Sequence, residues 1–311
     1  MVSNQPVFRT PPLAPTWQRW LLYSPLARIV IFAAVAFVVG YAVHGALSSL
    51  GWFGKTGTPL QHALGMLSVE LSSSVIGYLV LVYGVERRSP RELSLPALPT
   101  YGVAWFFGGF LIFSTVVGVL WLCGSYHVLG VNPHVDWLPE VLVAGVAAGI
   151  FEEIVTRGVL FRLIEEGLGT WWALAISAMF FGGAHIFNPG ATLWSSAAIA
   201  IEAGILLALV FHVTRTLWAC IGLHAAWNIS QGTIYGIPVS GSDAKGLLQS
   251  TRTGPDWLSG GIFGAEASVV ALAVCTSVSV VLLVIALRRR SIVRPFWSRR
   301  VSPAYAATPT S

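Results

Sequence analysis

The sequence predicts an all-α fold, a polytopic bundle of membrane-spanning helices. Hydrophobic residues make up 55% of the 311 residues and charged residues only 10%, whereas ordinary soluble domains carry about 25% charged residues. So few charges cannot cover a water-facing surface of this size, and most of the surface is therefore expected to face lipid.

Apolar stretches recur along the chain, each near the roughly 20 residues that cross a bilayer as a helix. Eight can be marked: 29–49, 64–84, 103–123, 138–164, 172–187, 193–213, 217–235 and 264–287. They divide the chain into five regions. These are a flexible amino-terminal segment (1–25), three spans (26–137), a core of four spans (138–235), an outer loop with the last span (236–287) and a basic tail (288–311).

The basic residues predict the orientation of these spans. With eight spans and a cytoplasmic amino terminus, all of the 18 Lys and Arg residues except Lys55, Lys245 and Arg252 fall on the cytoplasmic side. This is the positive-inside pattern, and it places both termini in the cytoplasm. The basic run after residue 287 is expected to bind anionic lipid headgroups rather than nucleic acid. A multi-pass protein of a bacterial plasma membrane fits this pattern, as does one of an endomembrane.

Acidic residues within the predicted spans require an explanation, because a charge near the bilayer centre costs at least about 2.5–3.5 kcal/mol. There are five: Glu70, Glu152, Glu153, Glu202 and Glu266. Glu202 and Glu266 belong to no motif and are expected to be structural. Glu266 lies close enough to the outer boundary that we expect it to be solvated.

The fourth segment contains adjacent carboxylates, Glu152 and Glu153, followed by Arg157. Glu153 and Arg157 are four residues apart with the acid first, so we expect an ion pair on one face of the helix, with a structural role. Successive residues point about 100° apart, which leaves Glu152 without a partner on its own helix. An unpaired carboxylate in a desolvated site is suited to general-base chemistry.

Two further segments contain polar pairs at helical spacing. Phe181 and His185 lie four residues apart near the end of the fifth segment, and His224 and Asn228 do so in the seventh. His224 and Asn228 therefore point into one volume, where two such donors suit a developing oxyanion. Interhelical hydrogen bonding is the structural alternative for this pair.

Taken together, these segments resemble the CAAX prenyl endopeptidase and bacteriocin-processing (CPBP, or Abi) family of intramembrane proteases. The family pattern is EExxxR, FxxxH and HxxxN or HxxxD on separate membrane helices. It is matched by Glu152, Glu153 and Arg157, by Phe181 and His185, and by His224 and Asn228. The resemblance covers roughly residues 138–235.

The resemblance implies peptide hydrolysis, with a membrane-associated, possibly CAAX-type, protein or peptide as the substrate. Glu152 and His185 would activate a water molecule, and His224 and Asn228 would stabilise the oxyanion. Glu153, Arg157 and Phe181 would support them. A zinc ion held by Glu152, His185 and His224 is the alternative that the family's description as metalloproteases raises.

The sequence favours a mechanism without a metal or other cofactor. It contains no HExxH helix, and neither His185 nor His224 has a carboxylate partner on its own helix. Two other functions stay open: a proton-coupled transporter, because intramembrane carboxylates and histidines also relay protons, and a non-catalytic immunity or scaffold protein. The three cysteines show no paired spacing, so neither a disulfide framework nor a cysteine metal cluster is expected.

Overall fold

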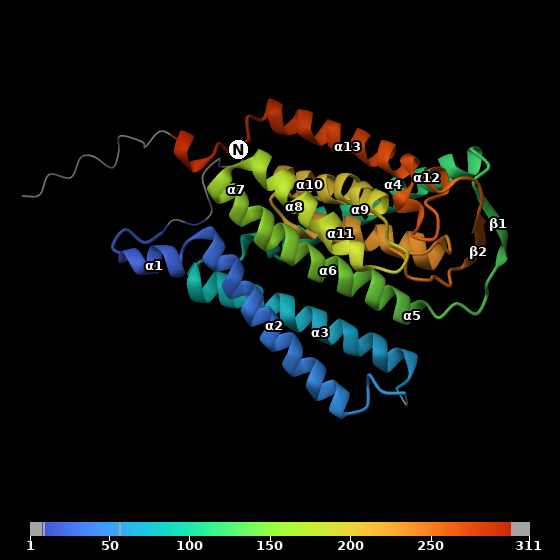
Figure 1. The fold of residues 1–311 in the computed structure, drawn as a ribbon, viewed down its shortest axis with the longest axis horizontal. Helices are drawn as coiled ribbons and strands as arrows, with labels where there is room; N and C mark the ends of the chain where they lie inside the picture. Colours follow the sequence, from blue (N-terminus) through green and yellow to red (C-terminus); the bar gives the residue numbers. More distant parts are fainter. Residues whose placement is uncertain (1–7, 9, 56, 300–311) are drawn as a thin grey trace, which may run out of the picture.

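The computed structural model describes residues 8, 10–55 and 57–299, which form a bundle of long helices with one small sheet (Figure 1). This part of the chain contains eight continuous helical segments, several of which include π-helical turns. They are α2 (Pro25–Ser49); α3 and η1 (Pro59–Leu79, Val80–Val85); η3 and α4 (Leu98–Gly102, Val103–Leu122); α5, η4, α6, η5 and α7 (Trp137–Glu140, Val141–Ala147, Ala148–Glu153, Ile154–Phe161, Arg162–Leu168); α8 and η6 (Thr170–Ala184, His185–Phe187); α9, η7 and α10 (Leu193–Ile199, Ala200–Ile205, Leu206–Thr214); α11 and η8 (Leu217–Asn228, Ile229–Ile234); and α13 (Val269–Arg288). The predicted polytopic helical fold is confirmed.

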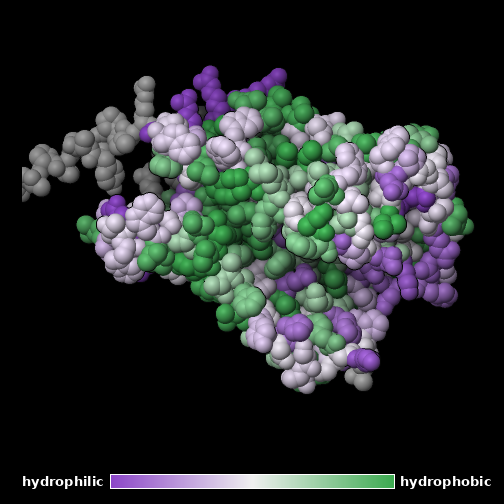
Figure 2. Space-filling model, in the orientation of Figure 1, coloured by the Kyte–Doolittle hydropathy of each residue, from purple (hydrophilic) through white to green (hydrophobic). Residues whose placement is uncertain are grey.

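Apolar composition separates six of these eight segments from the other two. Six are long and apolar enough to cross a membrane, and Figure 2 shows hydrophobic residues over the middle of the face it presents. The other two, 137–168 and 217–234, carry two of the three motifs, and the third, with Phe181 and His185, lies on the apolar segment 170–187. Every residue of α11 except Trp218 is buried. Because α11 faces protein rather than lipid, it need not be as apolar as a lipid-facing span.

One end of the bundle, here called the sheet end, carries β1 (Tyr126–Val131) and β2 (Leu248–Arg252) (Figure 1). The two strands pair antiparallel, with a bulge between Val128 and Gly130. Two short helices, α12 (Asp256–Ser259) and η9 (Ala265–Ala267), lie in the same outer loop as β2. The sequence did not predict this sheet, because its strands come from two loops far apart in the chain.

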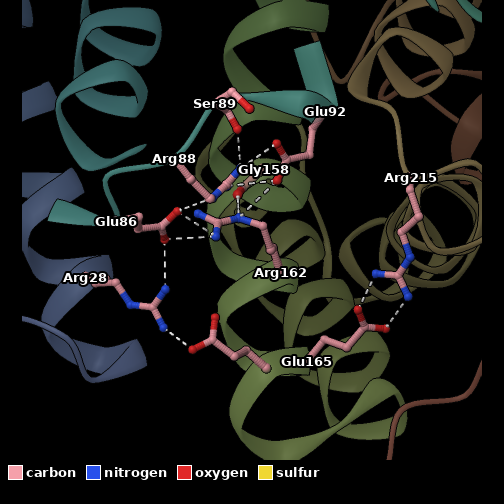
Figure 3. Close-up of polar contacts among 10 residues, drawn as sticks. Arg28, Glu86, Arg88, Ser89, Glu92, Gly158, Arg162, Glu165 and Arg215 are labelled. Atoms are coloured by element: carbon pink, nitrogen blue, oxygen red, sulfur yellow. Dashed lines mark hydrogen bonds and ion pairs between the residues drawn. The ribbon is translucent and has the colours of Figure 1, made fainter. Parts of the chain in front are cut away.

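The opposite end, here called the arginine-rich end, is closed by buried ion pairs around Glu86 (Figure 3). Glu86 accepts hydrogen bonds from Arg28 at 2.8 Å, Arg88 at 2.6 Å and Arg162 at 2.9 Å. Burial alone would raise the pKa of Glu86, but the three guanidinium groups outweigh it and lower the pKa. These contacts join the ends of α2, η1 and α7.

A second ion-pair group at this end surrounds Glu165. Its carboxylate accepts hydrogen bonds from Arg215, as Figure 3 shows, and lies 2.7 Å from His212 Nδ1. The other nitrogen of His212 is 2.9 Å from Ser291 Oγ, just beyond α13. The carboxy-terminal end of α13 is thereby tied to α7 and α10.

Described residues of both terminal regions contact the helical bundle. Within 1–25, expected to be flexible, α1 (Thr16–Leu21) is helical, and the buried Phe8 ring lies 4.4 Å from the Arg28 guanidinium carbon. Within the basic tail, Val293 exchanges hydrogen bonds with Thr170 at 2.9 and 3.0 Å. Residues 1–7, 9 and 300–311 lie outside the described part of the chain.

Glycines allow α4 and α11 to approach each other closely. A Cβ added to Gly222 would lie 2.2 Å from the Gly102 carbonyl oxygen, and one added to Gly109 would lie 2.5 Å from that of Leu223. Both distances are far below van der Waals contact, so only a residue without a side chain fits. Such small residues at helix crossings are typical of membrane bundles, where close packing replaces the hydrophobic effect.

Substitution of Gly222 by Ala is therefore expected to lower the free energy of unfolding by about 1–3 kcal/mol, because the helices must move apart. Gly118→Ala is the matched control on α4, since a Cβ there would meet nothing within 4 Å. Unfolding of the two purified variants in detergent measures the difference. Equal stability of the two would contradict the close-packing argument.

Candidate active site

The structure brings the three motifs together in the middle of the bundle. Two cavities meet there. The larger, of about 460 Å³, is lined by Glu152 and opens among residues of the sheet end, including Glu140, Asn188 and Asp243. The smaller, of about 30 Å³, is lined by Phe181, Glu202 and Glu266. Four residues line both cavities and so form their boundary: His185, His224, Asn228 and Ser240.

Glu153 is the residue that connects two of the motifs. Its Oε1 accepts a hydrogen bond from Arg157 Nη1 at 2.8 Å, as the spacing predicted. The same oxygen lies 2.8 Å from Nδ1 of His224, on the other side of the helix interface. Arg157 also donates to the carbonyl oxygens of Ala203 and Gly204, at 3.0 and 3.1 Å. This network fixes α11 and η7 against the helix that carries both glutamates.

His185 is oriented by its own helix. Its Nδ1 lies 2.7 Å from the Phe181 carbonyl oxygen. Because a carbonyl only accepts, Nδ1 must carry the hydrogen, and Nε2 is left for the cavity. The Phe181 ring packs against the His185 ring at 4.7 Å between centroids, and the Arg157 guanidinium lies 4.7 Å from the same Phe181 ring. Phe181 also lines the small cavity, so its ring forms part of the wall beside His185.

Glu152 has the environment expected of a reactive carboxylate. Its Oε2 is buried and has no hydrogen-bond partner among the described residues. The side chain as a whole is 29% exposed, into the larger cavity. Nε2 of His224 lies 4.0 Å from Oε2, which is beyond direct hydrogen bonding but close enough for a shared water or substrate atom.

Asn228 and His224 face the same volume, as their spacing predicted. The Asn228 amide donates one hydrogen to the Ala144 carbonyl oxygen at 2.8 Å, which leaves its second N–H available. Both residues are largely buried, at 8% exposure each. Because bulk water is distant, a charge that develops beside these two side chains interacts strongly with them.

The side chains do not form a metal-ligand cluster. No group of three or more His, Cys, Asp or Glu side chains among the described residues is arranged to hold a metal ion. Glu152, His185 and His224, the zinc ligands that the resemblance offers, do not form such a group. One argument from sequence was incomplete, because His224 does have a carboxylate partner, Glu153 on another helix.

Three carboxylates near the site were not assigned to it from sequence. Glu266, expected to be solvated, is only 3% exposed and lines the small cavity, so that expectation was wrong. The outer loop covers it, and the Ser240 backbone N–H donates to its Oε1. Glu202, also 3% exposed, lines the same cavity. Glu70 lines the larger cavity opposite Glu152. Position within an apolar span was the only sequence signal for the three, and it does not tell which cavity a side chain reaches.

Comparison with known proteins extends this picture. Residues 134–230 match the family described as "Type II CAAX prenyl endopeptidase Rce1-like". That segment contains all seven motif residues and ends before Glu266. A Bacillus subtilis (strain 168) protein described as "Putative membrane peptidase YdiL" is 25% identical over 218 residues, which cover 65% of this chain and 82% of that protein. Both findings bear out the family resemblance that the three motifs indicated.

Proposed function

We propose that this chain, which matches the Rce1-like family over residues 134–230, is an intramembrane endopeptidase that hydrolyses a peptide bond of a membrane-associated protein or peptide. The observation that carries the proposal is the meeting of His185, His224 and Asn228 at the boundary of two cavities, the larger of which Glu152 also lines. The larger cavity has a volume in the range of known ligand pockets and accommodates a short peptide segment.

Water activation is assigned to Glu152 and His185. The attacking water is placed at the boundary of the two cavities, beside His185 and within the larger cavity that Glu152 lines. Glu152 takes a proton from that water as the water oxygen bonds to the carbonyl carbon of the substrate. The C–N bond then breaks, and Nε2 of His185 relays the proton to the leaving amine nitrogen.

Stabilisation of the oxyanion of the tetrahedral intermediate is assigned to His224 and Asn228. The free N–H of Asn228 donates to it directly. His224 donates through Nε2 when both ring nitrogens carry hydrogen, an arrangement in which Nδ1–H remains bound to Glu153. Arg157 keeps Glu153 in place during this step, since it binds the same carboxylate oxygen.

The predicted orientation gives the direction of substrate entry. The arginine-rich end corresponds to the cytoplasmic side, and the sheet end to the outer side of what we propose is a bacterial plasma membrane. The larger cavity opens among sheet-end residues. We therefore assign substrate entry to the outer face, while ion pairs close the cytoplasmic end.

Glu152→Gln and His185→Gln are each expected to lower kcat by at least about 10³-fold, because each removes a group that handles a proton. The assay uses the purified protein in liposomes with a pool of internally quenched peptides. Each peptide is anchored in the membrane by an apolar segment and ends in a CAAX sequence, with or without a farnesyl group. Arg294→Lys, at an exposed site of the tail, is the control. Full activity in both variants, with their folds intact, would refute the mechanism.

Activity is also expected to persist after metal removal, since the mechanism assigns no step to a metal. The measurement is cleavage of the same peptides after prolonged chelation, with elemental analysis of the protein before and after. Loss of activity that zinc restores would instead support a ligand set of Glu152, His185 and His224.

The orientation can be tested with a natural cysteine. Cys123 is exposed at the sheet end, whereas Cys220 and Cys275 are buried. A membrane-impermeant maleimide is expected to label intact cells that express the wild type, but not those that express Cys123→Ser. In that background, a cysteine introduced by Ser298→Cys at the arginine-rich end should react only after permeabilisation. Labelling of that cysteine in intact cells would reverse the proposed entry side.

A further inference from the structure

A carboxylate from outside the family-matched segment closes the small cavity. Glu266 belongs to η9, ahead of α13, and the matched segment ends at residue 230. It nevertheless lines the same cavity as His185 and His224, and only 3% of it is exposed. Nothing in the mechanism above uses this carboxylate. Buried carboxylates beside reacting groups are often part of a functional site.

Glu266 is held in place by the outer loop. Its Oε1 accepts the backbone N–H of Ser240, and the Ser240 carbonyl oxygen accepts from the Asn188 amide at 3.0 Å. Gly264, with φ of +136°, allows the loop to come so close that a Cβ there would lie 2.4 Å from the Pro238 carbonyl oxygen. On the other side, Trp194 Nε1 donates to Ala267 at 2.8 Å. The carboxylate is therefore positioned on a tightly packed support.

Glu202 is the other carboxylate of the small cavity, so two acids share one small buried space. Burial raises the pKa of Glu266, although the Ser240 hydrogen bond and the His185 ring oppose that rise. A positive charge on His185 therefore favours the ionised form of Glu266.

A negative charge on Glu266 would stabilise His185 when the ring of His185 is protonated. Its Nδ1 is committed to the Phe181 carbonyl oxygen, so a proton taken up during catalysis must go to Nε2, on the cavity side. The resulting imidazolium would lie in a small, largely enclosed space. A fixed negative charge beside it lowers the free energy of that state, and one that is preorganised costs no rearrangement during the reaction.

We propose that Glu266 is a positioning residue of the active site, which orients His185 and stabilises its protonated ring across the small cavity. This inference rests on the proposed endopeptidase function. The outer loop, which lies beyond the family-matched segment, thereby contributes to the proton transfer through His185.

The test is Glu266→Gln, which keeps the size and the acceptor oxygen for Ser240 but removes the charge. The purified variant is assayed in liposomes with the quenched peptide that the wild type cleaves fastest. We expect kcat to fall by about 10- to 100-fold, with KM changed by less than about threefold. Glu166→Gln is the matched control at the arginine-rich end, where the carboxylate pairs with Arg28. It should lower the melting temperature and leave kcat unchanged.

A double-mutant cycle shows whether Glu266 acts through His185. In single-turnover assays of a His185→Gln background, Glu266→Gln should reduce the residual rate by less than about twofold. An equal loss in both backgrounds, or a wild-type kcat in the single variant, would overturn the proposal. If Glu266→Gln does not fold, Glu266→Asp enters the same cycle, with a smaller expected loss of kcat that also disappears without His185. Activity retained in Glu152→Gln would instead refute the proposed mechanism, and a wild type that cleaves none of the peptides would refute the endopeptidase function itself.

Discussion

The carboxylate of Glu153 is the contact on which the rest of the site depends. One of its oxygens lies 2.8 Å from both Arg157, on its own helix, and His224, on α11. Removing one partner from a buried ion pair typically costs about 3–5 kcal/mol, because it leaves an uncompensated charge. The packing of these helices and the placement of His224 are therefore set by the same atoms. Glu152, one residue earlier and about 100° around the helix, is left free for chemistry.

The same residue types serve opposite purposes at different depths of the bundle. At the arginine-rich end, Glu86 accepts hydrogen bonds from three arginines, and this network holds helix ends together. At the site, one oxygen each of Glu70 and Glu152 is buried without a hydrogen-bond partner, as is one of Glu166 at the arginine-rich end. Glu70 and Glu152 differ from Glu166 in that they line the larger cavity and pair with no arginine, an arrangement typical of function rather than of structural support.

Much of the fold and part of the site follow from local patterns in the sequence. Apolar stretches in the sequence located all eight helical segments, six of which are long and apolar enough to cross a membrane. The i, i+4 spacing predicted the contact between Glu153 and Arg157 and the shared face of His224 and Asn228. The link from Glu153 to His224, the β1–β2 sheet and the burial of Glu266 could not be predicted in this way. Each joins residues far apart in the chain, and no local periodicity encodes such a pairing.

The segments 137–168 and 217–234, which are less apolar than the six candidate spans, carry two of the three motifs, and His185 comes from the apolar segment 170–187. A polar helix alone in lipid would be destabilised by each polar group that it exposes. In the bundle, α11 packs against α4, α6 and α10, and it is buried along almost its whole length. Polar residues are tolerated in the membrane interior because other helices cover them, and the same helices enclose a small cavity lined by polar groups, as the proposed peptide hydrolysis requires.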